Sequence, residues 1–137
     1  MKLNQITLAV AAVLALIFVV HAFHLSMTPP RVVGLAITIP SFLLFVLARI
    51  QLGSAFSIEA KAETLVTTGL YSRIRNPIYF FGALMMAGAI VFANMPLLLL
   101  VFVVLVPLQI YRSRKEAQLL AEKFGNAYLD YKRQTWF

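Results

Sequence analysis

The sequence predicts an all-α integral membrane protein with about four transmembrane helices, a C-terminal helical hairpin and a cytoplasmic amphipathic tail helix. Of its 137 residues, 61% are hydrophobic and only 12% are charged, and the mean hydropathy is +0.87. This balance is typical of chains that lie largely in lipid. The apolar residues also gather in four runs that polar or proline-containing turns separate. We therefore expect residues 1–137 to form a single membrane domain.

Each apolar run approaches the length of about 20 residues that a helix needs to cross a hydrocarbon core about 30 Å thick. The predicted spans cover residues 6–23, 32–50, 78–93 and 96–111. Pro29 and Pro30 break the chain between the first two spans. Asn94 and Pro96 predict a tight turn between the last two, because proline cannot continue a helix and asparagine favours turns. The last two spans should therefore form a helical hairpin.

The first run follows Lys2, as the apolar part of a secretory signal would. Its end, residues 19–23, lacks the small-x-small pattern of a signal peptidase site, so we expect a retained helix. His21 and His24 lie three residues apart near its outer end. Histidines at a membrane interface contact headgroups more often than a metal, and we predict no metal site.

The basic residues predict the orientation, because cytoplasmic flanks of membrane proteins carry an excess of Lys and Arg. With four spans and a cytoplasmic N-terminus, all of the twelve Lys and Arg residues except Arg31 fall on the cytoplasmic side. The five acidic residues lie on that side as well. We therefore expect both termini in the cytoplasm of a bacterial or archaeal cell, and any chemistry at the cytoplasmic face.

Two cytoplasmic segments remain, a connector at residues 51–77 and a tail at residues 112–137, and the hairpin should bring them together. Apolar residues of the tail recur at spacings of three and four, which predicts an amphipathic helix that is interrupted or ends near Gly125. These residues are Ala117, Leu120, Phe124, Tyr128 and Tyr131. We expect this stripe to lie in the membrane interface; a surface anchor without further function is the simpler alternative.

Composition narrows the possible partners. The chain has no cysteine, which excludes disulfides, thiolate metal ligands and cysteine nucleophiles. Its net charge of +7 comes from residues that flank apolar runs, so we expect membrane lipids and no nucleic acid as partners. Small residues of the third span predict close helix packing, within the chain or in a homo-oligomer. They are Gly82, Ala83, Ala87, Gly88 and Ala89.

The connector and the tail together carry a hydrogen-bonding and aromatic set of side chains. Its members are Tyr71, Asn76, Tyr79 and Glu116, with Arg75 and Arg112 beside them. Aromatic faces attract a cationic centre, and a carboxylate accepts hydrogen bonds from hydroxyl or amine groups. Methyl transfer from a sulfonium needs little beyond such binding, because holding the reactants together and excluding water provide most of the acceleration.

Three motifs in this order carry a family resemblance. Residues 65–71 read LVTTGLY, residues 75–79 read RNPIY, and Glu116 precedes Phe124, Gly125, Tyr128 and Tyr131. Over about residues 49–133 the chain resembles the isoprenylcysteine carboxyl methyltransferase family. That family belongs to a wider group of integral-membrane methyltransferases that includes phospholipid N-methyltransferases.

The resemblance implies S-adenosylmethionine held between the connector and the tail, with a lipophilic small-molecule, lipid or lipidated substrate entering from the bilayer. The positions that match the family's cofactor-binding residues are Glu63, Thr64, Leu65, Val66, Tyr71, Asn76, Pro77, Ile78, Tyr79 and Glu116. Arg112 matches an arginine associated with the substrate, and Arg75 opens the loop that matches the family's Arg-His-Pro-x-Tyr motif. These two arginines are the predicted catalytic residues.

Two departures leave alternatives open. Asn76 replaces the family's usual histidine, as in phospholipid methyltransferases, so a phospholipid N-methyltransferase is one alternative. Ala117 replaces the second glutamate of a pair that begins with Glu116, so a relative that has lost catalysis and serves as a membrane scaffold is another. A transporter or channel is disfavoured, because no predicted span carries an acid or base at its middle.

Overall fold

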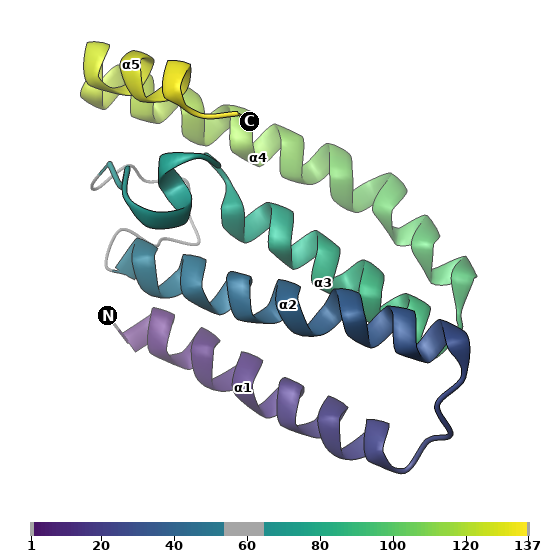
Figure 1. Cartoon of the computed structure of the whole chain (residues 1–137). Coiled ribbons are helices and arrows are strands. Elements are labelled where there is room, and N and C mark those ends of the chain that lie inside the picture. The colour runs from purple at the N-terminus through teal and green to yellow at the C-terminus, as the bar shows by residue number, and fades with distance from the viewer. Residues whose placement is uncertain (1, 54–64, 137) are drawn as a thin grey trace.

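The computed structural model describes residues 2–53 and 65–136 (Figure 1). They form α1 (Lys2–Phe23), α2 (Pro29–Leu52), the 3₁₀ helix η2 (Gly69–Ser72), α3 (Pro77–Ala93), the 3₁₀ helix η3 (Pro96–Leu100), α4 (Val101–Phe124) and α5 (Asn126–Gln134). These residues contain no strand, so the predicted all-α class is confirmed.

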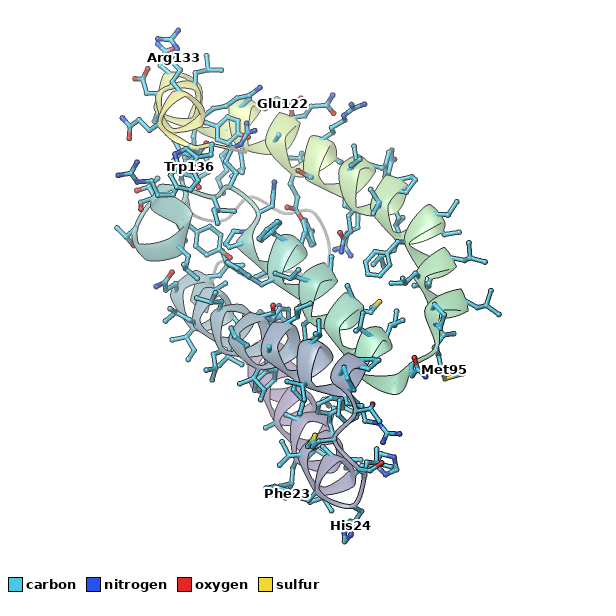
Figure 2. The ribbon with its side chains drawn as sticks, turned by 45° about the vertical axis from the view of Figure 1, so that its right-hand side comes forward. Phe23, His24, Met95, Glu122, Arg133 and Trp136 are labelled. Carbon is cyan, nitrogen blue, oxygen red and sulfur yellow. The ribbon has the colours of Figure 1, made fainter. Side chains whose placement is uncertain are left out.

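The four long helices lie side by side in chain order (Figure 1). The start of α1, η2 and α5 lie at one end of the molecule, and the loop between α1 and α2 lies at the other, with the turn after α3. Figure 2 shows the same separation, with Arg133 and Trp136 at one end and Phe23, His24 and Met95 at the other. The described part of the connector, with η2, and the tail, with α5, therefore share one end, as the hairpin predicts.

Helices α2 and α3 form the closest contact in the fold, because small residues let their backbones approach. A Cβ atom added to Gly88 would lie 2.5 Å from Thr38 Oγ1 and 2.8 Å from the Thr38 backbone nitrogen. A Cβ atom added to Gly34 would overlap the backbone of Phe92. All four residues are buried. Close packing through the small residues of the third predicted span is thus confirmed at Gly88, within one chain.

The turn between α3 and η3 depends on a left-handed residue. Asn94 has φ 55° and ψ 41°, a conformation that asparagine tolerates better than most residues. Its backbone N–H donates to the carbonyl groups of Ile90 and Val91, which would otherwise lack a partner at the helix end. Pro96 then begins η3. The predicted turn at residues 94–96 is confirmed.

Two segments of the described chain are long and apolar enough to cross a membrane, α2 and the continuous stretch Pro96–Phe124. Two more apolar helical segments are shorter, Ala12–Phe23 and α3. With 17 residues, α3 is about 25 Å long, slightly less than a hydrocarbon core of about 30 Å. Four helical segments therefore match the predicted positions, while the count of four spans stays a prediction.

The tail differs from its predicted form. We expected an amphipathic helix within the tail at residues 112–137, separate from the last span, whereas α4 runs without a break from Val101 to Phe124. Gly125, with φ 54°, ends α4 and precedes α5. Tyr128 and Tyr131 on α5 are only 4% and 7% exposed, so the prediction that they face the membrane interface was wrong. Periodicity identified an apolar face but not the surface that covers it.

Candidate functional site

The candidate site begins where η2 docks on the end of α2. Gly69 has φ 61°, a conformation that side chains disfavour, and a Cβ atom there would overlap the side chain of Gln51. The Oε1 atom of Gln51 accepts a hydrogen bond from the backbone N–H of Leu70 at 2.8 Å. Ser72 closes η2 by donating to the carbonyl of Gly69 at 2.7 Å. This local structure fixes the loop that leads to α3.

Helix α3 starts with a residue pair that suits a helix N-terminus. Pro77 occupies the first turn, where its missing N–H costs nothing, and its side chain is fully buried. Asn76 stands at the N-cap position, but its side chain does not cap the helix. Its Nδ2 instead donates to Ser113 Oγ on α4 at 2.7 Å. The start of α3 is therefore tied to α4.

A second polar pair joins the same two helices. The hydroxyl of Tyr79 donates a hydrogen bond to Glu116 Oε1. The guanidinium of Arg112 lies over the ring of Tyr79, with its Cζ 5.6 Å from the ring centroid, which is within cation–π range. Arg112 and Glu116 are one helical turn apart, so both can meet Tyr79. A carboxylate, a phenol and a guanidinium thus meet at one point between α3 and α4.

Helix α5 and the residues after it cover the other side of the loop. Tyr131 donates to the carbonyl oxygen of Tyr71 at 2.7 Å, and this bond is buried. Tyr128 and Arg75 share a hydrogen bond between their side chains. The backbone N–H of Trp136 donates to the Arg73 carbonyl at 2.8 Å. Three alternate residues of the loop are therefore held by the C-terminal segment, which Figure 2 shows at this end of the molecule.

The tyrosines here are poorly solvated. Burial raises the pKa of Tyr71 well above its ordinary value, with contributions from nearby Tyr131, Glu116 and Tyr79, and the charge of Arg49 opposes the rise. Burial, with a smaller effect of Tyr128, raises the pKa of Tyr131 to about 12. These phenols consequently stay protonated near neutral pH and act as hydrogen-bond donors.

Arg75 has an unsatisfied donor. Its Nε atom is buried and has no hydrogen-bond partner among the described residues, although the side chain also bonds Tyr128. A buried donor without a partner costs about 1–3 kcal/mol, so such atoms often mark a place for a ligand or water. An anionic oxygen would satisfy this one.

The structure brings five of the predicted site residues together. The other predicted residues lie beside this group, pack elsewhere or fall outside the described part of the chain. The five are Tyr71, Asn76, Tyr79, Arg112 and Glu116. Arg75 adjoins them through Tyr128, Pro77 has a packing role, and Ile78 is half-buried. Leu65 and Val66 are half-buried in an irregular stretch before η2, and their role stays a prediction. Glu63 and Thr64 lie outside the described residues.

Two residues of this region escaped the sequence argument. Ser113 receives the hydrogen bond of Asn76, and it could have been found because it shares a helix face with Glu116, three residues later. Arg49, at the end of α2, is buried beside Tyr71 and Tyr79, and its position in the sequence gave no sign of that. Arginine at a span end is expected to face headgroups.

The arrangement can bind a molecule that carries both charges. The aromatic faces and the Glu116 carboxylate suit a cationic or hydroxyl-bearing group, and the arginines suit an anionic one. Among the residues that the structure describes, no group of three or more His, Asp or Glu side chains is placed to hold a metal ion.

The comparison with known families decides the class. A family model described as phospholipid methyltransferase matches residues 29–127, well over half of the chain. The chain belongs to this family. The match runs from the start of α2 into α5 and includes the five predicted site residues that the structure brings together. It confirms the membrane methyltransferase group that the three motifs predict. Searches of curated proteins and of solved structures found no match.

Proposed function

We propose that this protein transfers a methyl group from S-adenosylmethionine to a lipophilic acceptor. The reaction would take place at the end of the molecule where η2 and the start of α3 meet α4 and α5. The observation that carries the proposal is the meeting of Tyr79, Glu116 and Arg112 between α3 and α4. The phospholipid methyltransferase match supports the reaction class and a lipid substrate. When bound, S-adenosylmethionine supplies an electrophilic methyl group on a sulfonium.

The residues present fit such a donor. Glu116 offers a carboxylate for ribose hydroxyls or for an amine, and Tyr79 donates to its Oε1, which fixes the orientation of the carboxylate. The buried Nε of Arg75, without a partner among the described residues, offers a donor to the carboxylate of the amino-acid portion. Tyr71 and Tyr79 present aromatic rings at the same place.

The departure at residue 76 fits this scheme. Asn76 bonds Ser113 rather than contacting the polar pair of Tyr79 and Glu116 directly. A neutral amide at this position holds the start of α3 against α4, and a change of residue there need not remove a donor-binding charge. The loss of a second carboxylate at Ala117 leaves Glu116 as the acidic group, already held by Tyr79. Both departures are therefore compatible with catalysis.

Catalysis by these residues consists of positioning. Methyl transfer needs the donor methyl and the acceptor atom at near-attack distance, an effect that contributes about 7–11 kcal/mol in favourable cases. Arg112 follows the apolar part of α4, residues 101–111, which would face the membrane. We therefore expect its guanidinium to bind an anionic group of an acceptor in the membrane. Arg112 thus orients the acceptor, and Glu116 and Arg75 hold the donor.

The test is methyl transfer by the purified protein in lipid nanodiscs. We expect labelled methyl groups from S-adenosylmethionine to appear in lipid when phosphatidylethanolamine is supplied, detected by mass spectrometry of the extracted lipids. Arg112→Ala should reduce turnover at least about tenfold, or ~1.4 kcal/mol, while donor binding changes much less. If the protein binds the donor and methylates a prenylcysteine analogue but no phospholipid, the acceptor is of the isoprenylcysteine type.

One result would contradict the proposed methyl transfer. Failure of the folded wild-type protein to bind the donor or to methylate either acceptor would contradict the proposal. The chain would then be a relative that kept the fold and lost the reaction.

A further inference from the structure

Arg49 is the most deeply buried charged side chain among the described residues, with 4% of its surface exposed. It stands in the last turn of α2, and its guanidinium lies over the ring of Phe45, with Cζ 5.7 Å from the centroid. Ile50, the next residue, is 60% exposed. At this level of α2 the lipid-facing direction is therefore taken by isoleucine, and Arg49 points into the protein.

This orientation does not suit a topology anchor. A basic residue that only fixes the orientation of a span reaches outward to water and lipid phosphates. Burying a guanidinium instead costs several kcal/mol, which must be offset by local interactions. The cation–π contact with Phe45 offsets part of this, and the position near the negative end of the α2 dipole offsets some more. An uncharged side chain at this position would not carry this desolvation cost.

The neighbours of Arg49 suggest what its charge does. Phe45, the ring under its guanidinium, would lie 3.5 Å from a Cβ atom added to Gly82, one turn of α3 after Tyr79. Arg49 is therefore close enough to Tyr71 and Tyr79 for charge interactions with both.

The tight contact of α2 with α3, and the docking of η2 on Gln51, bring these two tyrosines to the end of α2 independently. A phenol oxygen that faces a cation turns its hydrogen away from it. For Tyr79, that hydrogen is donated to Glu116.

We propose that Arg49 is a positioning residue for donor binding, which acts through Tyr79 by holding its hydroxyl in the orientation that bonds Glu116. The guanidinium also supplies a positive charge that partly balances the carboxylate in a poorly solvated place, where charges interact more strongly than in water. Arg49 itself need not touch the donor. This inference rests on the donor site proposed above and extends it to α2, outside the three motifs that carry the resemblance.

The first experiment measures binding of the demethylated product, S-adenosylhomocysteine, by calorimetry in detergent, with thermal unfolding of the ligand-free protein as the measure of folding. Arg49→Gln should weaken binding at least about tenfold. Arg49→Lys, which keeps the charge but not the planar shape, should restore binding to within about threefold of the wild type. Arg31→Gln, at the opposite end of the molecule, is the matched control and should bind like the wild type.

A double-mutant cycle with Tyr79→Phe tests the route of the effect. If Arg49 acts through the Tyr79 hydroxyl, Arg49→Gln should weaken binding less than about threefold in the Tyr79→Phe background, because the hydroxyl it orients is gone. A purely structural role would give the same loss in both backgrounds and a loss that lysine does not restore. Either of those results would overturn the inference.

The outcomes separate the inference from the proposed function. Absence of binding by the folded wild-type protein would overturn both. Normal binding by the wild type and equal binding by Arg49→Gln would overturn the inference alone. Should Arg49→Gln fail to fold, Phe45→Leu replaces it: removing the ring under the guanidinium should weaken binding about threefold, with the same dependence on Tyr79. Unchanged binding by Phe45→Leu, or a loss of binding that does not depend on the Tyr79 hydroxyl, would then overturn the inference.

Discussion

The two contacts that α3 makes differ in kind. Against α2, it packs through Gly88 so closely that the Thr38 backbone nitrogen would lie 2.8 Å from an added Cβ. Against α4, at the opposite end of α3, it is joined by two side-chain hydrogen bonds, from Asn76 and Tyr79. The first contact has no room for a ligand or for a larger side chain. The second is built from groups that a ligand can also bind.

This difference separates the folding of the protein from its chemistry. Lipid tails are as apolar as leucine, so helices in a membrane associate through close packing rather than through burial of apolar area. The contact between α2 and α3 meets that need. The contact between α3 and α4 adds little packing, since none of the α4 residues is buried. We therefore expect substitutions in the first contact to affect stability, and those in the second to affect function.

The largest expected effect is that of Gly88→Ala. The added methyl group would lie 2.5 Å from Thr38 Oγ1 and close to two backbone atoms that cannot move independently. Overpacking of this kind costs about 1–3 kcal/mol, and we expect the upper part of that range, measured by thermal or denaturant unfolding in detergent. Gly82→Ala on the same helix is the control, because its Cβ would be at an ordinary 3.5 Å from the Phe45 ring. Equal stability of the two variants would show that the helices are not in close contact.

A smaller effect is expected at the bond between α3 and α4. Asn76→Ala and Ser113→Ala each remove the same hydrogen bond. Each should lower the free energy of unfolding by no more than about 1 kcal/mol and, because this bond holds the start of α3 beside the candidate site, weaken donor binding by up to about fivefold. The double variant should bind no more weakly than either single variant, since the partners act as a unit. Additive losses in a titration of the donor would mean that the two side chains act separately.

The smallest effect concerns Tyr131 and pH. Its pKa is raised by burial to about 12 from an ordinary value of 10.0, so the folded protein holds this proton more tightly than the unfolded chain does. Its contribution to stability is therefore complete below about pH 10 and is lost as the pH rises toward 12. Tyr131→Phe should cost about 1 kcal/mol at neutral pH, from the lost bond to Tyr71, and should make the alkaline decline shallower.

Unfolding temperatures measured across the alkaline range test that prediction. Tyr71 and Tyr128 are shifted in the same direction by burial, so part of the decline should remain in the variant. An unchanged slope in Tyr131→Phe would mean that Tyr131 is not buried against the loop.

Most of the fold could be predicted from the sequence, because helices and turns depend on residue types close together in the chain. Apolar runs set the helices, prolines and Asn94 set the turns, and the ordered motifs identified Tyr71, Tyr79, Arg112 and Glu116 as neighbours. These elements need only spacing and residue type. The structure has a helix at each apolar run and a turn at residues 94–96, and it brings the four side chains together, while their roles stay predictions.

The sequence could not predict which helix faces pack against one another. The tail periodicity was right, but Tyr128 and Tyr131 pack on the connector loop instead of lipid, because one helical stripe can be covered by either. Arg49 and Ser113 were missed for a related reason. A basic residue at a span end and a serine in a helix are common, and only the packing of α2, α3 and α4 gives them their partners.

Calorimetric titration of S-adenosylmethionine and its demethylated product tests whether the polar side chains between α3 and α4 bind a methyl donor. We expect micromolar binding to the wild type and to Glu122→Ala, which changes an exposed glutamate on the same helix. Folded Glu116→Ala should bind at least about tenfold more weakly, a loss of ~1.4 kcal/mol. Equal affinity in Glu116→Ala, or no binding to the folded wild type, would contradict a donor site there.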